Sequence, residues 1–231
     1  MSSMERAAIP RTVPFALYMT FIGLEELLRL LAGQGIISFS AHSLYYLYPL
    51  KTLSVAAVLL LFIPRCREIT PRDLSNFGRT TVSILVGLTV FILWINMDWQ
   101  FGTIGKPQGF NPTLLSDGFS RNAMTLVRLV GAVIVVPIME ELFWRSFLIR
   151  YIIDHDFTKV TIGRFTCLSF LISTALFGME HNFFLAGMMA GVAYNLLLYY
   201  TRSISQCIVA HAVTNLALGI YVINTGKWYF W

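Results

Sequence analysis

A series of apolar runs, each close to 20 residues long and separated by short polar gaps, limits the folds open to this chain. A helix of about 20 apolar residues spans the hydrocarbon core of a bilayer. Only helices and closed barrels satisfy the backbone in lipid, and no ten-residue alternating pattern occurs. We therefore expect an all-α, polytopic transmembrane bundle of about seven helices, or eight if the fourth run breaks near Pro137. The runs lie at 13–33, 44–64, 80–99, 123–151, 163–181, 183–200 and 204–224.

Composition supports a chain embedded in the membrane throughout. Hydrophobic residues make up 56% of the 231 residues and charged residues 13%, which leaves no room for a soluble domain. The three cysteines lack the spacing of a disulfide framework or a thiolate zinc site. The net charge is +5, and the basic residues lie at the ends of apolar runs rather than on a soluble face. We therefore expect a lipid bilayer and no nucleic acid as partner. The prediction is one integral membrane domain, 1–231.

The polar gaps predict an orientation. The gap 65–79 has four arginines against two acidic residues, and basic gaps lie in the cytoplasm. Alternation then places the N-terminus in the cytoplasm and the long gap 98–121 on the outer side. The basic residues near 150–164 and at 202 fall inside as well.

Ionisable residues inside the fourth run form the first candidate site. Glu141 and Arg145 are four residues apart, acid before base, which favours an ion pair on one helix face. Glu140 is rotated by about 100° from that face. We expect a supporting Glu141–Arg145 pair that leaves Glu140 available, the alternative being that Glu140 pairs with Arg128 or Arg150.

Two later runs carry polar side chains at membrane depth. Phe177 and His181 are four residues apart in one run, and His211 and Asn215 are four apart in the last, so each pair shares a helix face. Polar groups that face lipid are costly. We therefore expect these groups and Glu140 to meet in a water-accessible cavity within the membrane.

The segment 24–31, LEELLRLL, is a look-alike of the first site. It contains Glu25, Glu26 and Arg29, but no histidine or amide follows in its run. We interpret Glu25 and Arg29 as a self-paired surface or interface element.

These residue types suit hydrolysis of an amide bond. A carboxylate and an imidazole near one water can remove its proton, which assigns Glu140 as the general base and His181 as its partner. An imidazole and an amide can stabilise an oxyanion, which assigns His211 and Asn215. Two histidines and a carboxylate are also a zinc set, so Glu140, His181 and His211 are the alternative metal ligands. HExxH is absent, and the sequence leaves zinc and no cofactor both open.

The three motifs, Glu140-Glu141-x-x-x-Arg145, Phe177-x-x-x-His181 and His211-x-x-x-Asn215, resemble in order and spacing the CPBP intramembrane proteases. That family includes the type II CAAX prenyl endopeptidases and bacteriocin-processing proteins of the Abi type. The resemblance covers about 125–220, so we expect N-terminal helices and a loop over 1–122 and the catalytic core over 123–224. Ser146 and Glu180 depart from the family's usual small residues.

The resemblance implies a helical bundle with a conical cavity that cleaves the tail or leader of a membrane-tethered protein. The substrate is then a peptide or protein, prenylated in a CAAX protease, and much of the family is classed as metalloprotease. It implies the same roles for the first glutamate and first histidine on water, and for the last histidine and asparagine on the oxyanion. Short bacterial members are closest in size, so we expect a bacterial or archaeal cell membrane.

Two other functions use the same residues. Buried glutamate, histidine and asparagine also build the pathways of proton- or ion-coupled transporters. A noncatalytic scaffold or immunity protein would keep the cavity without turnover. The lack of an internal repeat argues against transport, and the complete set of base and oxyanion groups argues against a role in binding alone.

The helix that ends at His181 presents a problem of depth. Counted at 1.5 Å per residue from the cytoplasmic ends of their runs, His181 lies about 25 Å deep and His211 about 10 Å deep. We therefore expect the helix before His181 to begin below the bilayer or to tilt strongly, with the junction MEHNFF inside the protein.

Overall fold

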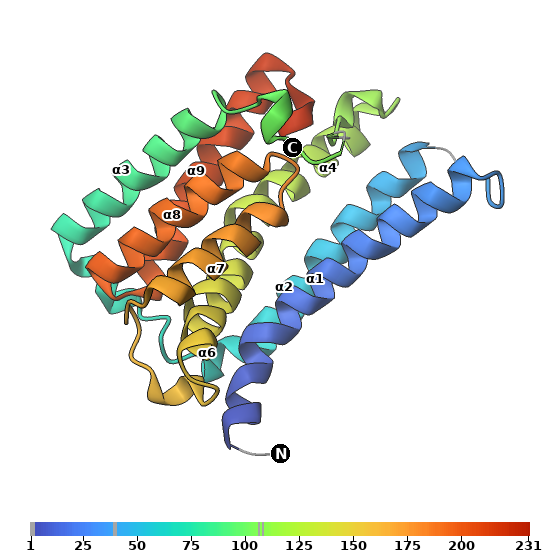
Figure 1. The fold of residues 1–231 in the computed structure, drawn as a ribbon. Helices are drawn as coiled ribbons and strands as arrows, with labels where there is room; N and C mark the ends of the chain where they lie inside the picture. The colour runs from blue at the N-terminus through green and yellow to red at the C-terminus, as the bar shows by residue number, and fades with distance from the viewer. Residues whose placement is uncertain (1–2, 39–40, 106, 108) are drawn as a thin grey trace.

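The computed structural model describes residues 3–38, 41–105, 107 and 109–231. Seven long helices form a bundle, and no strand occurs in these residues (Figure 1). Six of the helices are α1 Ser3–Gly33, α2 Leu47–Phe62, α3 Phe77–Trp94, α7 Cys167–Met179, α8 Phe184–Thr201 and α9 Ile204–Thr225. The seventh is composite and is described below. Short 3-10 helices lie at Ala41–Tyr46, Ile63–Arg65, Pro71–Ser75, Gln100–Gly102, Pro112–Leu114, Phe157–Lys159 and Trp228–Phe230.

The composite helix carries the first motif and runs without interruption from Gly118 to Ile153. It consists of α4 Gly118–Val130, a π-helical segment Gly131–Val135, α5 Val136–Glu141, a second π-helical segment Leu142–Leu148 and α6 Ile149–Ile153. The expected break near Pro137, and with it an eighth helix, is wrong. Proline lacks a backbone N–H and clashes with the preceding turn, and a wider π turn accommodates both effects inside a continuous helix.

Four helices are long and apolar enough to cross a membrane, and the chain is an integral membrane protein. The four segments are Ser43–Arg65, Phe77–Trp94, Phe184–Thr201 and Ile204–Thr225. Helix α7 is apolar but has only 13 residues, about 20 Å at 1.5 Å per residue. Helix α1 and the composite helix carry charged side chains along their length. The seven predicted runs are thus seven helices, of which four meet the length and hydropathy of a span.

Capping side chains fix where several helices begin. At the start of α3, α4, α7 and α9, a side-chain oxygen accepts a hydrogen bond from a backbone N–H of the first turn. The accepting side chains are those of Asn76, Asp117, Thr166 and Ser203, respectively. Helices α8 and α9 end at left-handed residues, Arg202 and Gly226. The polar gaps of the sequence therefore contain the signals that separate the helices.

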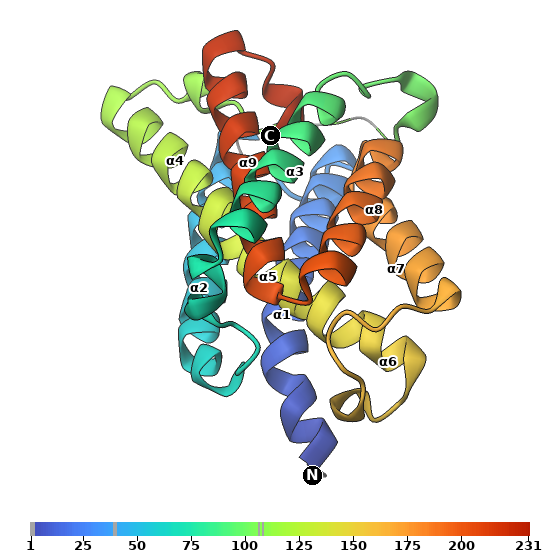
Figure 2. The same cartoon turned by 90° about the vertical axis from the view of Figure 1, so that its left-hand side faces the viewer.

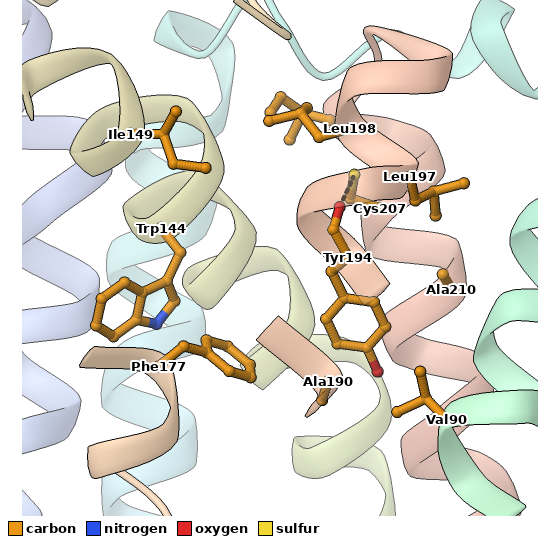
Figure 3. Packing of buried hydrophobic residues seen from close by; sticks show 11 residues of the cluster. Val90, Trp144, Ile149, Phe177, Ala190, Tyr194, Leu197, Leu198, Cys207 and Ala210 are labelled. Atoms are coloured by element: carbon orange, nitrogen blue, oxygen red, sulfur yellow. Dashed lines mark hydrogen bonds between the residues drawn. The ribbon is translucent and has the colours of Figure 1, made fainter. Parts of the chain in front are cut away.

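The helices pack around one buried core. Helices α1 and α2 run side by side as a hairpin, α3 lies along α9, and α7 lies along α8 (Figures 1 and 2). Helix α9 also contacts the composite helix. In Figure 3, Trp144 and Phe177 lie on one side of the core and Tyr194 on the other, with Cys207 beside the Tyr194 backbone. This packing brings all three sequence motifs to the middle of the bundle.

The bundle has two ends. The N-terminal end holds the chain start and the connections 63–76, 154–166 and 202–203. The opposite end holds the connections 34–46, 95–117 and 180–183 together with the C-terminus.

A buried polar cluster closes the N-terminal end. Arg11 of α1 makes a bidentate ion pair with Glu68, with nitrogen–oxygen distances of 2.6 and 2.7 Å. The Ser146 hydroxyl donates to Glu68 and accepts from Arg11 and, at 2.9 Å, from Arg150. Ser146 therefore bridges α1, the 63–76 connection and the composite helix.

We predict that this cluster makes stability depend on pH. Burial alone would raise the pKa of Glu68, but hydrogen bonds from Arg11 and Ser146 outweigh burial and hold the pKa below its usual value. A lowered folded pKa stabilises the protein above the unfolded pKa, and that stability is lost as pH falls through the folded pKa. Thermal unfolding in detergent should show wild type more stable than Glu68→Gln at pH 7, with the difference shrinking toward pH 3. A difference independent of pH would contradict this assignment.

A second prediction concerns the contact of α3 with α9. A Cβ at Gly87 would meet the Ala210 carbonyl oxygen and would lie 2.9 Å from Val213 Cβ. Backbone cannot move aside as a flexible side chain can, so Gly87→Ala should lower the unfolding free energy by about 1–3 kcal/mol. Gly23→Ala on α1 is the matched control, because no atom lies within 4 Å of the added Cβ. Equal thermal stability of the two variants would show that this contact is not tight.

Candidate active site

A cavity of about 220 Å³ lies inside the bundle, and all four predicted catalytic side chains line it. Glu140 comes from the composite helix, His181 from the α7–α8 connection, and His211 and Asn215 from α9. A wider cavity of about 640 Å³ adjoins it and shares His181 in its lining. The packing of the helices thus brings the three sequence motifs to one internal space.

The Glu141–Arg145 ion pair forms as predicted, at the bottom of the site. Arg145 Nη1 donates to Glu141 Oε1 at 3.1 Å, and both side chains are at most 1% exposed. Arg145 Nε donates to the side-chain oxygen Oδ1 of Asn195 at 3.2 Å, and the guanidinium lies 4.4 Å from the centre of the Phe177 ring. The pair is therefore held by an amide and an aromatic face as well as by its own charge.

Glu140 faces the cavity and not the ion pair. Its residue is 4% exposed, and one carboxylate oxygen has no hydrogen-bond partner in the described part of the chain. The nearest cationic candidate is the His211 ring, whose Nε2 lies 4.0 Å from Glu140 Oε2. Neither Arg128 nor Arg150 forms a salt bridge with it in the residues the structure describes. Glu140 is thus the available carboxylate of the motif.

The ring of His181 is oriented by its own helix. Its Nδ1 lies 2.8 Å from the Phe177 carbonyl oxygen, four residues earlier. A carbonyl oxygen only accepts, so Nδ1 carries the hydrogen and Nε2 is left with a lone pair. The Trp94 ring packs edge-on against the imidazole at 5.3 Å. The spacing Phe177-x-x-x-His181 therefore fixes both the position and the tautomer of the histidine.

His211 is oriented by Glu141 in the same manner. Its Nδ1 lies 2.9 Å from Glu141 Oε1, the oxygen that also accepts from Arg145. Because Glu141 is paired with an arginine it is an acceptor, so Nδ1 of His211 carries the hydrogen. Both histidines therefore direct Nε2 away from their fixed partners.

Asn215 is anchored by a carbonyl that the π turn releases. The Val136 N–H donates to the Gly131 carbonyl oxygen, and Pro137 has no N–H. Neither residue therefore donates a hydrogen bond to the Ala132 carbonyl oxygen. Asn215 Nδ2 donates to that Ala132 oxygen at 2.8 Å. The amide nitrogen has two hydrogens, so a second one remains for a ligand in the cavity.

Glu180 belongs to the site, although the sequence reading left its role undecided. A ligand atom of each of Glu140, Glu180 and His181 lies within 4.8 Å of the other two, and this is the group of described residues suited to a metal ion. His211 is not in this group, although its Nε2 lies 4.0 Å from Glu140 Oε2. Beside the set Glu140, His181 and His211 that the sequence left open, the structure therefore offers a second group in which Glu180 takes the place of His211.

The sequence reading missed two supporting residues of α8. The Tyr194 ring stacks on His211 at 5.1 Å, and its hydroxyl donates to Thr214 at 2.8 Å. Asn195 accepts from Arg145 and donates to Ser173 and Thr174. Polar Asn195 inside an otherwise apolar run is a signal that the sequence did contain.

The look-alike segment of α1 behaves as a surface pair. Arg29 donates to Glu25 at 2.6 Å, and the two side chains are about a quarter exposed. Glu25 and Arg29 line the wide cavity but are absent from the lining of the smaller one. The segment therefore lies at the mouth of the space and away from Glu140.

Comparison with known proteins gives one match. Residues 122–217 match the family model described as type II CAAX prenyl endopeptidase Rce1-like. The matched range contains the composite helix almost entirely and all three motifs, and it leaves out α1, α2 and α3. No curated protein and no solved structure matches the chain.

The buried and exposed ion pairs give a matched prediction. Glu141→Gln leaves Arg145 buried without a charge partner and offers His211 only a neutral acceptor, so it should lower the unfolding free energy by about 3–5 kcal/mol. Glu25→Gln removes the same i,i+4 ion pair at the surface and should change the unfolding free energy by at most about 0.5 kcal/mol. Thermal or chemical unfolding in detergent measures both. A small effect at Glu141 would show that its pair does not support the site.

Proposed function

Residues 122–217 match the family model of the Rce1-like type II CAAX prenyl endopeptidases, and from this match we propose that the chain is an intramembrane endopeptidase. Its substrate is a peptide bond in a membrane-tethered protein. The observation that carries the proposal is the meeting of Glu140, His181 and His211 in one internal cavity, with Nε2 of each ring directed away from a fixed Nδ1 partner.

In the proposed mechanism, Glu140 and the lone pair of His181 Nε2 hold one water. Glu140 removes a proton as the water oxygen attacks the substrate carbonyl, and the C–O bond that forms leaves a tetrahedral oxyanion. The proton held by Glu140 then passes to the leaving nitrogen as the C–N bond breaks. Desolvation inside the bundle strengthens each of these hydrogen bonds.

The oxyanion is stabilised from α9. Asn215 offers its second amide hydrogen without any proton transfer. His211 can donate from Nε2 only in its doubly protonated form, because its Nδ1 hydrogen is already directed to Glu141. Asn215 is therefore the donor present from the start of the reaction, and His211 the donor that depends on protonation.

The decisive test is cleavage of a membrane-tethered tail peptide by the purified chain in lipid. Glu140→Gln, His181→Ala and His211→Ala should each reduce the rate by about two orders of magnitude or more, since each removes a group that acts on the reacting atoms. Glu5→Gln makes the same change at an exposed position near the start of α1, outside both cavities, and should cleave at the wild-type rate. Undiminished cleavage by Glu140→Gln would end the proposal.

A metal-dependent version is the second candidate, and the grouping of Glu140, Glu180 and His181 favours it. Two carboxylates and an imidazole nitrogen with a lone pair are donors that zinc accepts. When bound there, a zinc ion would supply an activated water. Glu180 and His181 would then act as ligands. In the metal-free version Glu180 is a second carboxyl group beside Glu140 that makes the cavity more polar.

Elemental analysis separates the two versions. We expect chelation to leave cleavage unchanged and Glu180→Gln to retain part of the activity. Stoichiometric zinc in the purified protein that is lost in Glu180→Gln and His181→Ala but kept in His211→Ala would establish the metal-dependent version instead. Circular dichroism of each variant is the control that the fold is retained.

A further inference from the structure

Basic residues are unevenly divided between the two ends of the bundle. Ten of the seventeen lysines and arginines lie at or near the N-terminal end, in the start of the chain and in short connections. They are Arg6, Arg11, Arg65, Arg67, Arg72, Arg79, Arg150, Lys159, Arg164 and Arg202. At the opposite end the structure describes four, Arg29, Lys51, Arg121 and Lys227. Lysine and arginine in short connections are retained in the cytoplasm, so this division orients the N-terminal end toward the cytoplasm.

The cavities open at the end with few basic residues. The wide cavity is lined by the last turns of α1, by the α7–α8 connection, by four residues of the connection before α4 and by three C-terminal residues. The last two groups are Gly105, Pro107, Gly109 and Phe110, and Tyr229, Phe230 and Trp231. All four elements belong to the opposite end of the bundle (Figures 1 and 2). Its lining shares Arg128, Glu180 and His181 with the smaller cavity that contains Glu140. The route to Glu140 therefore starts from that end.

In the part of the chain that the structure describes, the cavity at the N-terminal end does not reach Glu140. It has about 460 Å³, is lined by residues 161–165 with Tyr199 and Arg202, and shares no residue with the smaller cavity. The two adjoining cavities around the site have no lining residue from the described connections 63–76 or 154–166. Between α1 and the composite helix, the space at that end is filled by the cluster of Arg11, Glu68, Ser146 and Arg150, in which Ser146 is fully buried. A bidentate ion pair at 2.6 and 2.7 Å within this cluster ties the 63–76 connection to α1.

We propose that the site is entered from the noncytoplasmic side of the membrane. The substrate class is then a polypeptide segment that has been translocated across the membrane and lies next to its anchor at the outer surface. Its identity as a substrate rests on the proposed function, whereas the side of entry rests on charge and cavity position alone. A prenylated tail held at the cytoplasmic surface would meet the closed end of the bundle.

Cysteine labelling in intact cells or spheroplasts tests the orientation on the full chain. Cys66 and Cys207 are buried and Cys167 is exposed, so Cys167→Ser provides the background. Ser116→Cys lies on an exposed stretch at the cavity end, and Ser75→Cys lies on an exposed turn at the basic end. Glu26→Cys reports on the wide cavity, because Glu26 lines it and is exposed.

A membrane-impermeant maleimide should label Ser116→Cys and Glu26→Cys in intact cells, and Ser75→Cys only after permeabilisation. The reverse pattern would overturn the proposal. Labelling needs no enzymatic turnover, so it is read equally well in a Glu140→Gln protein. The expected labelling without any cleavage would contradict the proposed function and support the orientation. Cleavage with the reversed labelling would support the proposed function and contradict the orientation.

The substrate class has a separate readout. Protein termini are compared between cells that carry the wild-type chain and cells that carry Glu140→Gln. New termini that depend on Glu140 should map to noncytoplasmic segments of membrane-anchored proteins, within reach of the anchor. Termini that map to cytoplasmic tails would overturn the proposed side of entry.

Discussion

The site depends on one carboxylate, Glu141, which accepts from both Arg145 and His211 through the same oxygen. Removing two charges and an imidazole from water costs several kcal/mol per ion unless the geometry compensates it. Compensation comes from Asn195 and from the faces of Phe177 and Tyr194 around the guanidinium. As a result the tautomer of His211 is fixed, and its Nε2 lies 4.0 Å from Glu140 Oε2. Two adjacent glutamates thus serve different tasks because they lie on different faces of one helix.

The irregular backbone of the composite helix lets it hydrogen-bond to α9 without being broken. The two π-helical segments on either side of Val136–Glu141 alter the helix register around the motif. The first of them, together with Pro137, leaves the Ala132 carbonyl for Asn215 of α9. The proline therefore fixes an amide of the site instead of ending the helix.

The short α7 explains how residues from different depths meet. It has 13 residues, begins at Cys167 and ends just before Glu180 and His181, so these two side chains enter the interior of the bundle. A backbone hydrogen bond of 2.7 Å from Ile104 to Asn182 covers the α7–α8 connection with the 95–117 segment. The junction MEHNFF, expected inside the protein, is only partly inside: Phe183 is buried, whereas Met179 and Asn182 are exposed at the end of the bundle. A full-length span would have carried His181 past the cavity.

Hydropathy alone determined the helical class and nearly all helix positions, because an apolar run of about 20 residues has few alternatives in lipid. Spacing of four residues determined the Glu141–Arg145 pair, the availability of Glu140 and the pairing of Phe177 with His181, since these contacts lie within one helix or one turn beyond it. Tertiary packing decided what no local pattern contains: that Glu180 joins Glu140 and His181, that Tyr194 and Asn195 support the site, and that Ser146 closes the far end. Those contacts join residues of different helices and connections, and only the crossing of helices sets their distance.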